Sequence, residues 1–178
     1  MSANPDLGAI ADEHMRCEFE LKSAERTMDT MTDNPYLNHV PTATGGAGRD
    51  AVFTFYRDVF IPSWPDDVGI QPSTRTIGSD RLVDELVVHF THTKRMDFML
   101  PGVEPTGRRV ELAHVVILGF EGDKVAYERI YWDQASLLAQ VGLLDANTVP
   151  ALGAEQASTV LDRHAPLNAI SERFDSAP

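Results

Sequence analysis

Ionisable side chains are interspersed with apolar ones along the stretch from Thr91 to Gln134. Two runs rich in Val, Ile, Tyr and Phe are joined there by Glu121-Gly122-Asp123-Lys124, a pattern typical of a tight β-hairpin. A two-residue turn places Glu121 opposite Lys124. Counting outward from that turn predicts four further cross-strand pairs: Ile117 with Glu128, Val115 with Ile130, Ala113 with Trp132, and His114 with Tyr131.

This pairing assigns the ionisable groups to faces of the sheet, because side chains alternate along a strand. Glu111 and Glu128 share one face, and the other face carries His114, Arg129 and Asp133. A carboxyl group buried on an apolar pocket face resists ionisation, which makes it a candidate acid or base near neutral pH. Glu128 is the stronger candidate. The alternative is that both glutamates face solvent.

The rest of the chain predicts the elements that position these strands. The first segments are a long helix over residues 6–32 ended by Thr32-Asp33-Asn34-Pro35, a short strand over 36–40, and a helix from 49 stopped by Pro62 and Pro65. Two strands over 68–92 that bend at Ser79-Asp80 follow, and then a loop over 93–107. After the hairpin we expect a helix over 134–144 with Asp133 as its N-cap, and a short helix around 154–162. Helices followed by consecutive strands indicate an α+β fold. We expect a strongly curved antiparallel sheet with the N-terminal helices on one face, leaving a cone-shaped pocket. The convex face is then the expected surface of a homodimer.

Composition narrows the class of protein. The chain has 178 residues and a formal net charge of −12, which fits one domain over 1–178 and disfavours nucleic acid or an anionic membrane as a partner. We expect a core at about 8–145 and a tail over 146–178. The single cysteine, Cys17, excludes an internal disulfide and is expected to be buried in the first helix. Residues 1–7 lack the features of a signal peptide, and no run reaches the roughly 20 apolar residues of a membrane span, so a cytoplasmic protein is expected.

Several short motifs in this order carry a resemblance. They are Y-L-N-H-V-P from Tyr36, G-R-D-A-V from Gly48, K-R-M-D from Lys94, P-T-G from Pro105, and G-D-K-V-A-Y-E-R-I-Y-W-D-Q-A-S-L-L from Gly122. Over roughly residues 8–145 the chain resembles the nuclear transport factor two-like superfamily. Within it, the chain is similar to the SnoaL-like cyclases and the limonene-epoxide-hydrolase-like enzymes.

The resemblance implies roles for individual residues. The epoxide-hydrolase branch activates water with an Arg-x-Asp pair, a second Asp on the last strand, and an Asn and a Tyr beside the first strand. Arg95 and Asp97 match the Arg-x-Asp pair, so Arg95 would polarise a substrate oxygen and Asp97 would orient it. His39 stands at the Asn position. The position of the second Asp holds Ile130, and Glu128, two residues earlier on the same face, is the candidate replacement. Alternatively, Arg95 with Asp97 is a surface ion pair and His39 is structural.

These observations predict an enzyme that performs cofactor-independent acid–base chemistry on a hydrophobic oxygenated small molecule. The reaction would be a cyclisation, isomerisation, dehydration or epoxide hydrolysis, and the alternative is a ligand-binding or dimerising scaffold without catalysis. The catalytic candidates are Arg95, Asp97, Glu128 and His39. The substrate-binding candidates are Tyr36, Asn38, His92, Phe98, Glu111 and Trp132. No metal site is expected, because His89 and His92 differ by three positions and point to opposite faces of a strand.

Overall fold

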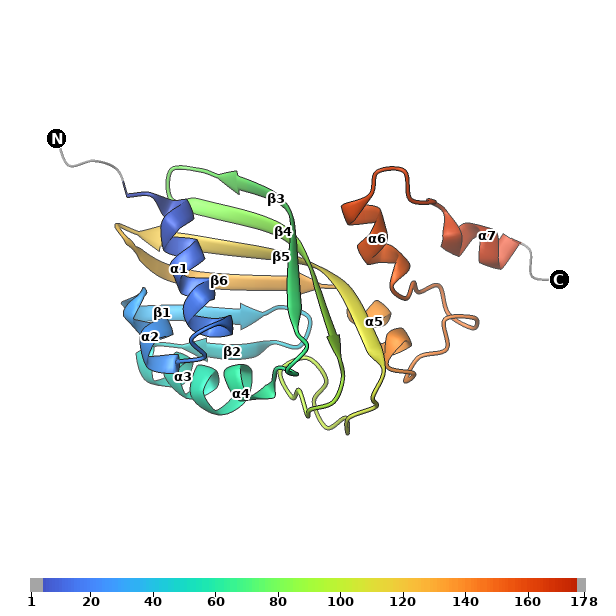
Figure 1. Ribbon diagram of the computed structural model, residues 1–178, viewed down its shortest axis with the longest axis horizontal. Coiled ribbons are helices and arrows are strands. Elements are labelled where there is room, and N and C mark those ends of the chain that lie inside the picture. Colours follow the sequence, from blue (N-terminus) through green and yellow to red (C-terminus); the bar gives the residue numbers. More distant parts are fainter. Residues whose placement is uncertain (1–4, 176–178) are drawn as a thin grey trace.

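The computed structural model describes residues 5–175 and contains one open sheet of six strands (Figure 1). The strands are β1 (Met31–His39), β2 (Thr44–Ala47), β3 (Gly69–Ile77), β4 (Arg81–Thr91), β5 (Arg109–Glu121) and β6 (Lys124–Trp132). Their order across the sheet is β2-β1-β6-β5-β4-β3. The α+β class is confirmed. The sheet is mixed, however, because β1 runs parallel to β6, while every other neighbouring pair is antiparallel.

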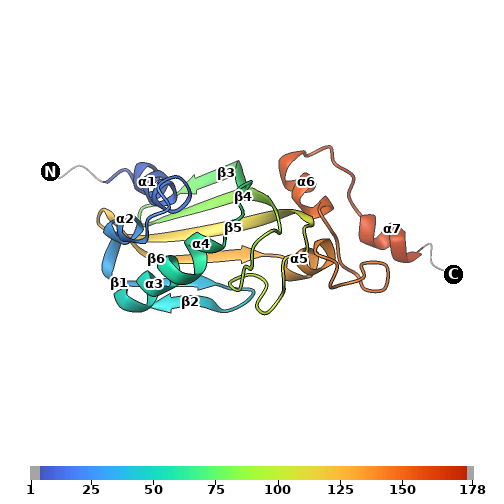
Figure 2. The same ribbon diagram turned by 60° about the horizontal axis from the view of Figure 1, so that its bottom comes forward.

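Helices flank this sheet on one face and at one end. They are α1 (Leu7–Phe19), α2 (Ala24–Asp29), α3 (Arg49–Phe55), a π-helical turn (Tyr56–Phe60), α4 (Ile61–Ser63), α5 (Gln134–Gln140), α6 (Glu155–Leu161) and α7 (Ala169–Asp175). Helices α1 to α4 lie across one face, whereas α5 to α7 lie toward the end of the sheet where β6 finishes (Figures 1 and 2). No helix among the described residues is long and apolar enough to cross a membrane.

The predicted single helix over residues 6–32 is wrong, because the chain forms two helices and then a strand. Asp6 caps α1 by accepting a hydrogen bond from the backbone N–H of Ala9. After α1, Lys22 adopts a left-handed conformation with φ of 49°, and the Ser23 hydroxyl then caps α2. A left-handed residue followed by a serine cap restarts a helix in a new direction. The short α2 therefore turns the chain into β1.

The β5–β6 hairpin has the predicted turn but not the predicted register. Glu121 pairs with Lys124, and Phe120 pairs with Val125, but Gly119 pairs with Tyr127. Ala126 is thus an extra residue in β6, and such a β-bulge shifts every later pair by one position. The observed partners are Leu118 with Glu128, Val116 with Ile130, and His114 with Trp132.

The shifted register exchanges two predicted residues between the faces of the sheet. His114 now lies on the same face as Glu128, although it was expected on the opposite face. Glu111 is three positions from His114, so it lies on the other face, where its side chain is 47% exposed. A one-residue slip moves side chains to the opposite face of a strand, which accounts for both exchanges.

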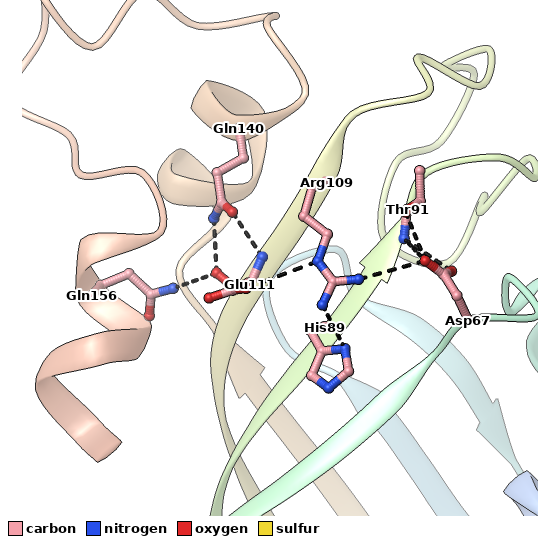
Figure 3. Close-up of polar contacts among 7 residues, drawn as sticks. All are labelled: Asp67, His89, Thr91, Arg109, Glu111, Gln140 and Gln156. Atoms are coloured by element: carbon pink, nitrogen blue, oxygen red, sulfur yellow. Dashed lines mark hydrogen bonds and ion pairs between the residues drawn. The ribbon is translucent and has the colours of Figure 1, made fainter. Parts of the chain in front are cut away.

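The chain after β6 is attached to the sheet by two glutamine side chains (Figure 3). Asp133 caps α5, as predicted, by accepting from the backbone N–H of Ala135. Strand β5 continues past the end of β6, and Gln140 from α5 both accepts from the Glu111 N–H and donates to the Glu111 carbonyl oxygen. Gln156 from α6 accepts from the Ala113 N–H and donates to the same carbonyl. The predicted short helix around 154–162 is therefore present, whereas α7 was not predicted.

We expect Gly119→Ala to destabilise the protein by about 1–3 kcal/mol, because overpacking a tight contact costs this much. A β-carbon at this position would overlap the ring of Tyr127, its cross-strand partner at the bulge. Urea unfolding measures the loss. Gly78→Ala is the matched control, because its β-carbon would meet nothing closer than 3.4 Å and its φ is not positive. Equal stability of both variants would contradict the packing at the bulge.

Candidate active site

A small chamber of about 50 Å³ lies on the concave face of the sheet, beneath α1 and the aromatic residues that follow α3. Four of its lining side chains are polar: Glu18, His39, His114 and Glu128. The others are apolar, namely Met15, Phe19, Leu37, Phe60, Trp64, Ile70, Leu86, Val88, Phe98, Val116, Ile130 and Trp132. The chamber therefore combines a few convergent polar groups with apolar walls, as enzyme pockets usually do.

One end of the chamber belongs to a buried polar cluster of four side chains: His14, Glu18, Tyr56 and Glu128. His14 and Glu18 are one helical turn apart on α1, and Glu128 enters from β6. Nε2 of His14 lies 3.2 Å from Glu18 Oε1 and 3.7 Å from Glu128 Oε2. The Tyr56 hydroxyl donates to Glu128 Oε2 over 3.0 Å and lies 3.3 Å from His14 Nε2. All four residues are buried.

The hydrogen bond of the other ring nitrogen of His14 shows which nitrogen carries a proton. Nδ1 lies 2.6 Å from the Thr30 hydroxyl oxygen, and this hydroxyl donates its only hydrogen to the Thr27 carbonyl over 2.6 Å. Thr30 must therefore accept from Nδ1, so Nδ1 carries a proton. Nε2 is the nitrogen that faces the two carboxyl groups.

Burial and mutual contact push the pKa values of this cluster apart. Burial alone would lower the pKa of His14, but the charges of Glu18 and Glu128 raise it to about 10. Burial and the negative charge of Glu128 raise the pKa of Glu18. Burial opposes ionisation of Glu128 as well, but its contacts with His14 and Tyr56 lower its pKa overall. The cluster thus combines an imidazole whose pKa is raised with two carboxyl groups whose pKa values are shifted in opposite directions.

Another part of the chamber wall is an aromatic cage around His39. The ring of His39 lies 5.3–5.7 Å, centroid to centroid, from those of Phe55, Phe60, Phe98 and Trp132. Burial lowers the pKa of His39 to about 4, so this imidazole is neutral at pH 7. Its Nδ1 makes no well-formed hydrogen bond among the described residues, and the backbone of its strand partner Thr44 interacts with the ring as a polar neighbour. An unpaired buried nitrogen is costly, and a bound hydroxyl or carbonyl-containing ligand would satisfy it.

His114 is a second neutral imidazole in the wall. Its Nδ1 donates to the Leu112 carbonyl over 2.9 Å, and burial lowers its pKa to about 4. Its ring lies 5.6 Å from that of Trp132, which is held by a hydrogen bond from its indole N–H to Gln134. The structure therefore brings together four of the predicted site residues, His39, Phe98, Glu128 and Trp132, and adds His114 to them.

The expected inward orientation of Arg95 and Asp97 is wrong. Their side chains are 53% and 47% exposed, and they pair with each other over 2.9 Å. They lie in the loop between β4 and β5, where the strict alternation of a strand does not apply. Met96 and Phe98 take the buried positions in this segment, which leaves the charged residues outside. Asp97 also accepts from the Gly102 N–H, so the pair stabilises the turn of the loop.

Four further predicted substrate-binding residues do not line the chamber. Leu37 and His39 face inward, so the alternating residues Tyr36 and Asn38 face outward, and Tyr36 is 41% exposed. His92 is buried, but its ring contacts Thr106 instead of the chamber. Glu111 lies on the outer face beside Arg109, 3.8 Å away, as Figure 3 shows.

Sequence reasoning missed three members of the buried cluster: His14, Glu18 and Tyr56. His14 and Tyr56 stood among the apolar positions of their helices, and Glu18 among the polar ones between them. The available signal was the spacing of His14 and Glu18, which places both side chains on one helix face. That face is the one α1 turns toward the sheet.

The cluster also has the spacing of a metal site. Among the described residues, His14, Glu18 and Glu128 each offer one ligand atom, and these atoms lie within 4.8 Å of one another. Imidazole and carboxylate are ligands that zinc accepts. His14 Nε2 and the Tyr56 hydroxyl give the carboxyl groups a different source of compensation, since Nε2 lies 3.2 Å from Glu18 Oε1 and the hydroxyl donates to Glu128 Oε2.

Comparison with known proteins adds family and fold. A sequence model of a family described as SnoaL-like polyketide cyclase matches residues 18–141. None of the curated proteins compared with the chain matches it. A candidate polyketide cyclase from Acidithiobacillus ferrooxidans superposes with a TM-score of 0.61 at 17% identity, covering 79% of this chain and 97% of that one.

Two further solved structures have the same fold. A protein with a ketosteroid isomerase-like fold from Catenulispora acidiphila, in complex with trimethylamine, gives a TM-score of 0.59 at 12% identity and covers 80% of this chain and 96% of its own. The epoxide hydrolase/cyclase-like enzyme SalBIII, described for pyran ring formation in salinomycin, gives a TM-score of 0.53 at 16% identity. The match covers 71% of this chain and 89% of SalBIII.

We expect the free energy of unfolding to fall between pH 7 and pH 10 because of His14. Its folded-state pKa of about 10 lies above the ordinary value of 6.5, so the stabilisation is fully present below pH 6.5 and is lost as the pH rises through 10. Urea unfolding across this range measures the loss. The groups facing the imidazole are Glu18, Tyr56, Glu128 and Thr30.

The double variant His14→Gln/Glu128→Gln is the control, because neutral amides replace the ion pair while the other titrating groups remain. Its stability should change less with pH than that of the wild type. The same slope in both proteins would show that His14 is not an imidazolium in the folded state.

Proposed function

The chain belongs to the SnoaL-like polyketide cyclase family, and from this premise we propose that it catalyses a cofactor-independent acid–base reaction on a hydrophobic oxygenated small molecule. The membership supports a small-molecule cyclase-type role. The observation that carries the finer proposal is the pair Glu18 and Glu128. These two carboxyl groups line one apolar chamber and have pKa values shifted in opposite directions.

The opposite shifts assign the roles. A carboxylate kept ionised in an apolar site can accept a proton, and a neighbouring carboxyl group kept neutral can donate one. Glu128 is therefore the base, which removes a proton from substrate carbon, from a hydroxyl group or from a water molecule. Glu18 is the acid, which protonates the substrate oxygen where negative charge develops. The reaction then leaves the total number of protons on the two groups unchanged.

The remaining polar groups serve these two. His14 and Tyr56 hold Glu128 in its ionised form and act as positioning residues. His39 has an unpaired nitrogen in the aromatic cage and would hold a substrate hydroxyl or carbonyl group. Cyclisation, isomerisation, dehydration and epoxide hydrolysis can each use a base together with an acid. Carboxyl oxygens of Glu18 and Glu128 lie within 4.8 Å of each other, close enough to act on one reacting centre. The apolar walls favour a substrate that is hydrophobic around its oxygen.

A second candidate function is binding of an apolar ligand without turnover. Two observations favour it: the chamber measures only about 50 Å³, and Arg95, the expected oxyanion partner, is on the surface. In this case the buried cluster would stabilise the packing of α1 on the sheet. A compound that binds and is converted indicates the enzyme, whereas a compound that binds and is not converted indicates the ligand-binding function.

Assembly and location belong to the same proposal. We expect a homodimer through the outer face of the sheet, in the cytoplasm. Light scattering after gel filtration would give the mass of the assembly, and a monomer would remove the first of these two expectations.

We expect Glu128→Gln to lower kcat/KM by about 10²–10⁴-fold, the usual contribution of a general base. The assay is conversion of a panel of apolar ketones, epoxides and tertiary alcohols, followed by mass spectrometry and NMR. Glu111→Gln is the matched control, since this glutamate lies on the neighbouring strand but on the outer face of the sheet. It should retain wild-type activity.

Three outcomes would count against the proposal. Equal activity of wild type and Glu128→Gln would remove Glu128 as the base. Binding of panel compounds without any conversion would favour the ligand-binding function. Activity lost on treatment with EDTA and restored by a divalent cation would show that His14, Glu18 and Glu128 hold a metal.

A further inference from the structure

A second, larger hollow lies beside the chamber, in the form of an open groove of about 690 Å³ between α1 and strands β3 and β4. Helix α1 contributes Asp12, Met15, Arg16 and Phe19 to it, and Glu20, the C-cap of this helix, contributes a fifth residue. Their spacing of three, four, seven and eight residues places them along a single face of the helix. The strands and the residue before β3 contribute Val68, Ile70, Pro72, Ser73, Thr74, Arg75, Asp84, Glu85 and Leu86.

The groove and the chamber share a partition. Met15, Phe19, Ile70 and Leu86 line both hollows. These four side chains are the apolar floor of the groove and also the roof over Glu18 and Glu128. A molecule lying in the groove is therefore separated from the buried cluster by one layer of side chains.

Strand β3 is irregular where it borders the groove. Ser73 is an extra residue between the β3–β4 pairs Pro72–Leu86 and Thr74–Glu85, so the strand is bulged beside α1. Beyond the bulge, Arg75 donates to both oxygens of Asp84 over 2.7 and 2.8 Å, and to Asp12 over 2.8 Å. This guanidinium group ties both strands to α1 and fixes one end of the groove.

The two volumes decide how a substrate can fit. A chamber of about 50 Å³ has room for only a few atoms, because one water molecule needs roughly 10–15 Å³ by the same measure. Drug-sized ligands occupy pockets of roughly 300–1,000 Å³. Of these two hollows, only the groove has that size.

We propose that the groove binds the apolar body of the substrate while only its oxygen-bearing head passes the partition of Met15 and Phe19 into the chamber. This inference rests on the proposed function, since it takes the chamber as the reaction site. The unbranched thioether side chain of Met15 is flexible and can change rotamer to allow this movement. Phe19 packs edge-on against Phe60, at 6.0 Å between ring centroids, and contacts Trp64 at 5.6 Å.

The charges on the rim indicate that the substrate is not an anion. Four carboxyl groups border the groove, on Asp12, Glu20, Asp84 and Glu85. Its two guanidinium groups are already paired, since Arg75 binds Asp84 and Asp12, and Arg16 binds both oxygens of Glu13 over 2.8 Å. An anionic ligand would find mainly like charge. The class that fits is a neutral polycyclic or long-chain compound with hydroxyl or carbonyl oxygens at one end.

Tryptophan fluorescence offers a direct test, because the sequence contains two tryptophans, and Trp64 and Trp132 both line the chamber. The probe is 1,8-dihydroxyanthraquinone, which is neutral at pH 7, and its charged counterpart is anthraquinone-2-sulfonate. We expect the neutral probe to quench the wild-type protein at micromolar concentration. The sulfonate should need at least about ten times more, a difference of roughly 1.4 kcal/mol.

Two variants test the two parts of the site. Val68→Asp places a charge in the groove lining but outside the chamber, and we expect it to weaken probe binding by about tenfold or more. Ile77→Asp is the matched control, because Ile77 is 52% exposed and lies on the same side of the protein at the end of β3, outside the groove lining. Phe19→Ala removes part of the partition and should raise the association rate constant in stopped-flow quenching by about tenfold.

The outcomes separate this inference from the proposed function. Quenching that is absent in the wild type, or unchanged by Val68→Asp, would overturn binding in the groove. An unchanged association rate in Phe19→Ala would overturn the role of the partition. Normal quenching by Glu128→Gln, combined with its loss in Val68→Asp, supports the groove even if no turnover is found.

Discussion

Burial of two carboxyl groups beneath α1 is the constraint on which the rest of the structure depends. Neither Glu18 nor Glu128 can be ionised there without a compensating positive charge, because the interior solvates charge poorly. His14 supplies that charge from the same helix as Glu18, and Thr30 fixes the ring so that Nε2 faces the carboxyl groups. Removal of one partner from such a buried pair typically costs about 3–5 kcal/mol. The position of α1 on the sheet is thus coupled to the ionisation of the site.

The same constraint explains why the site needs elements that are far apart in the sequence. Glu18 comes from α1, Glu128 from β6, and the Tyr56 hydroxyl that binds Glu128 from the π-helical turn. The β-bulge at Ala126 sets the face on which Glu128, Ile130 and Trp132 lie relative to β5. Without that extra residue, His114 and Glu128 would lie on opposite faces of the sheet. One inserted residue therefore decides which ionisable groups meet in the chamber.

Sequence patterns predicted the parts of the structure that local physics determines. The Glu121–Lys124 turn, the Asp133 cap and the inward position of Glu128 follow from turn chemistry, capping and alternation. The bulge could not be predicted, because Gly119 and Ala126 look ordinary until the ring of Tyr127 is seen to cover the glycine. Arg95 and Asp97 matched a motif of related enzymes, but the motif presupposes a strand, and here the segment is a loop. The partners of His14 were hidden because only tertiary packing brings α1 to β6.

The two glutamines that bind the end of β5 have a consequence beyond holding the C-terminal helices in place. Residues Glu111 and Ala113 would otherwise present free backbone donors and an acceptor at a sheet edge, where another chain could add a strand. Gln140 and Gln156 occupy those groups with side-chain amides, which imitate a neighbouring strand but cannot propagate one. The segment after β6 therefore blocks the addition of a further strand at this stretch of β5.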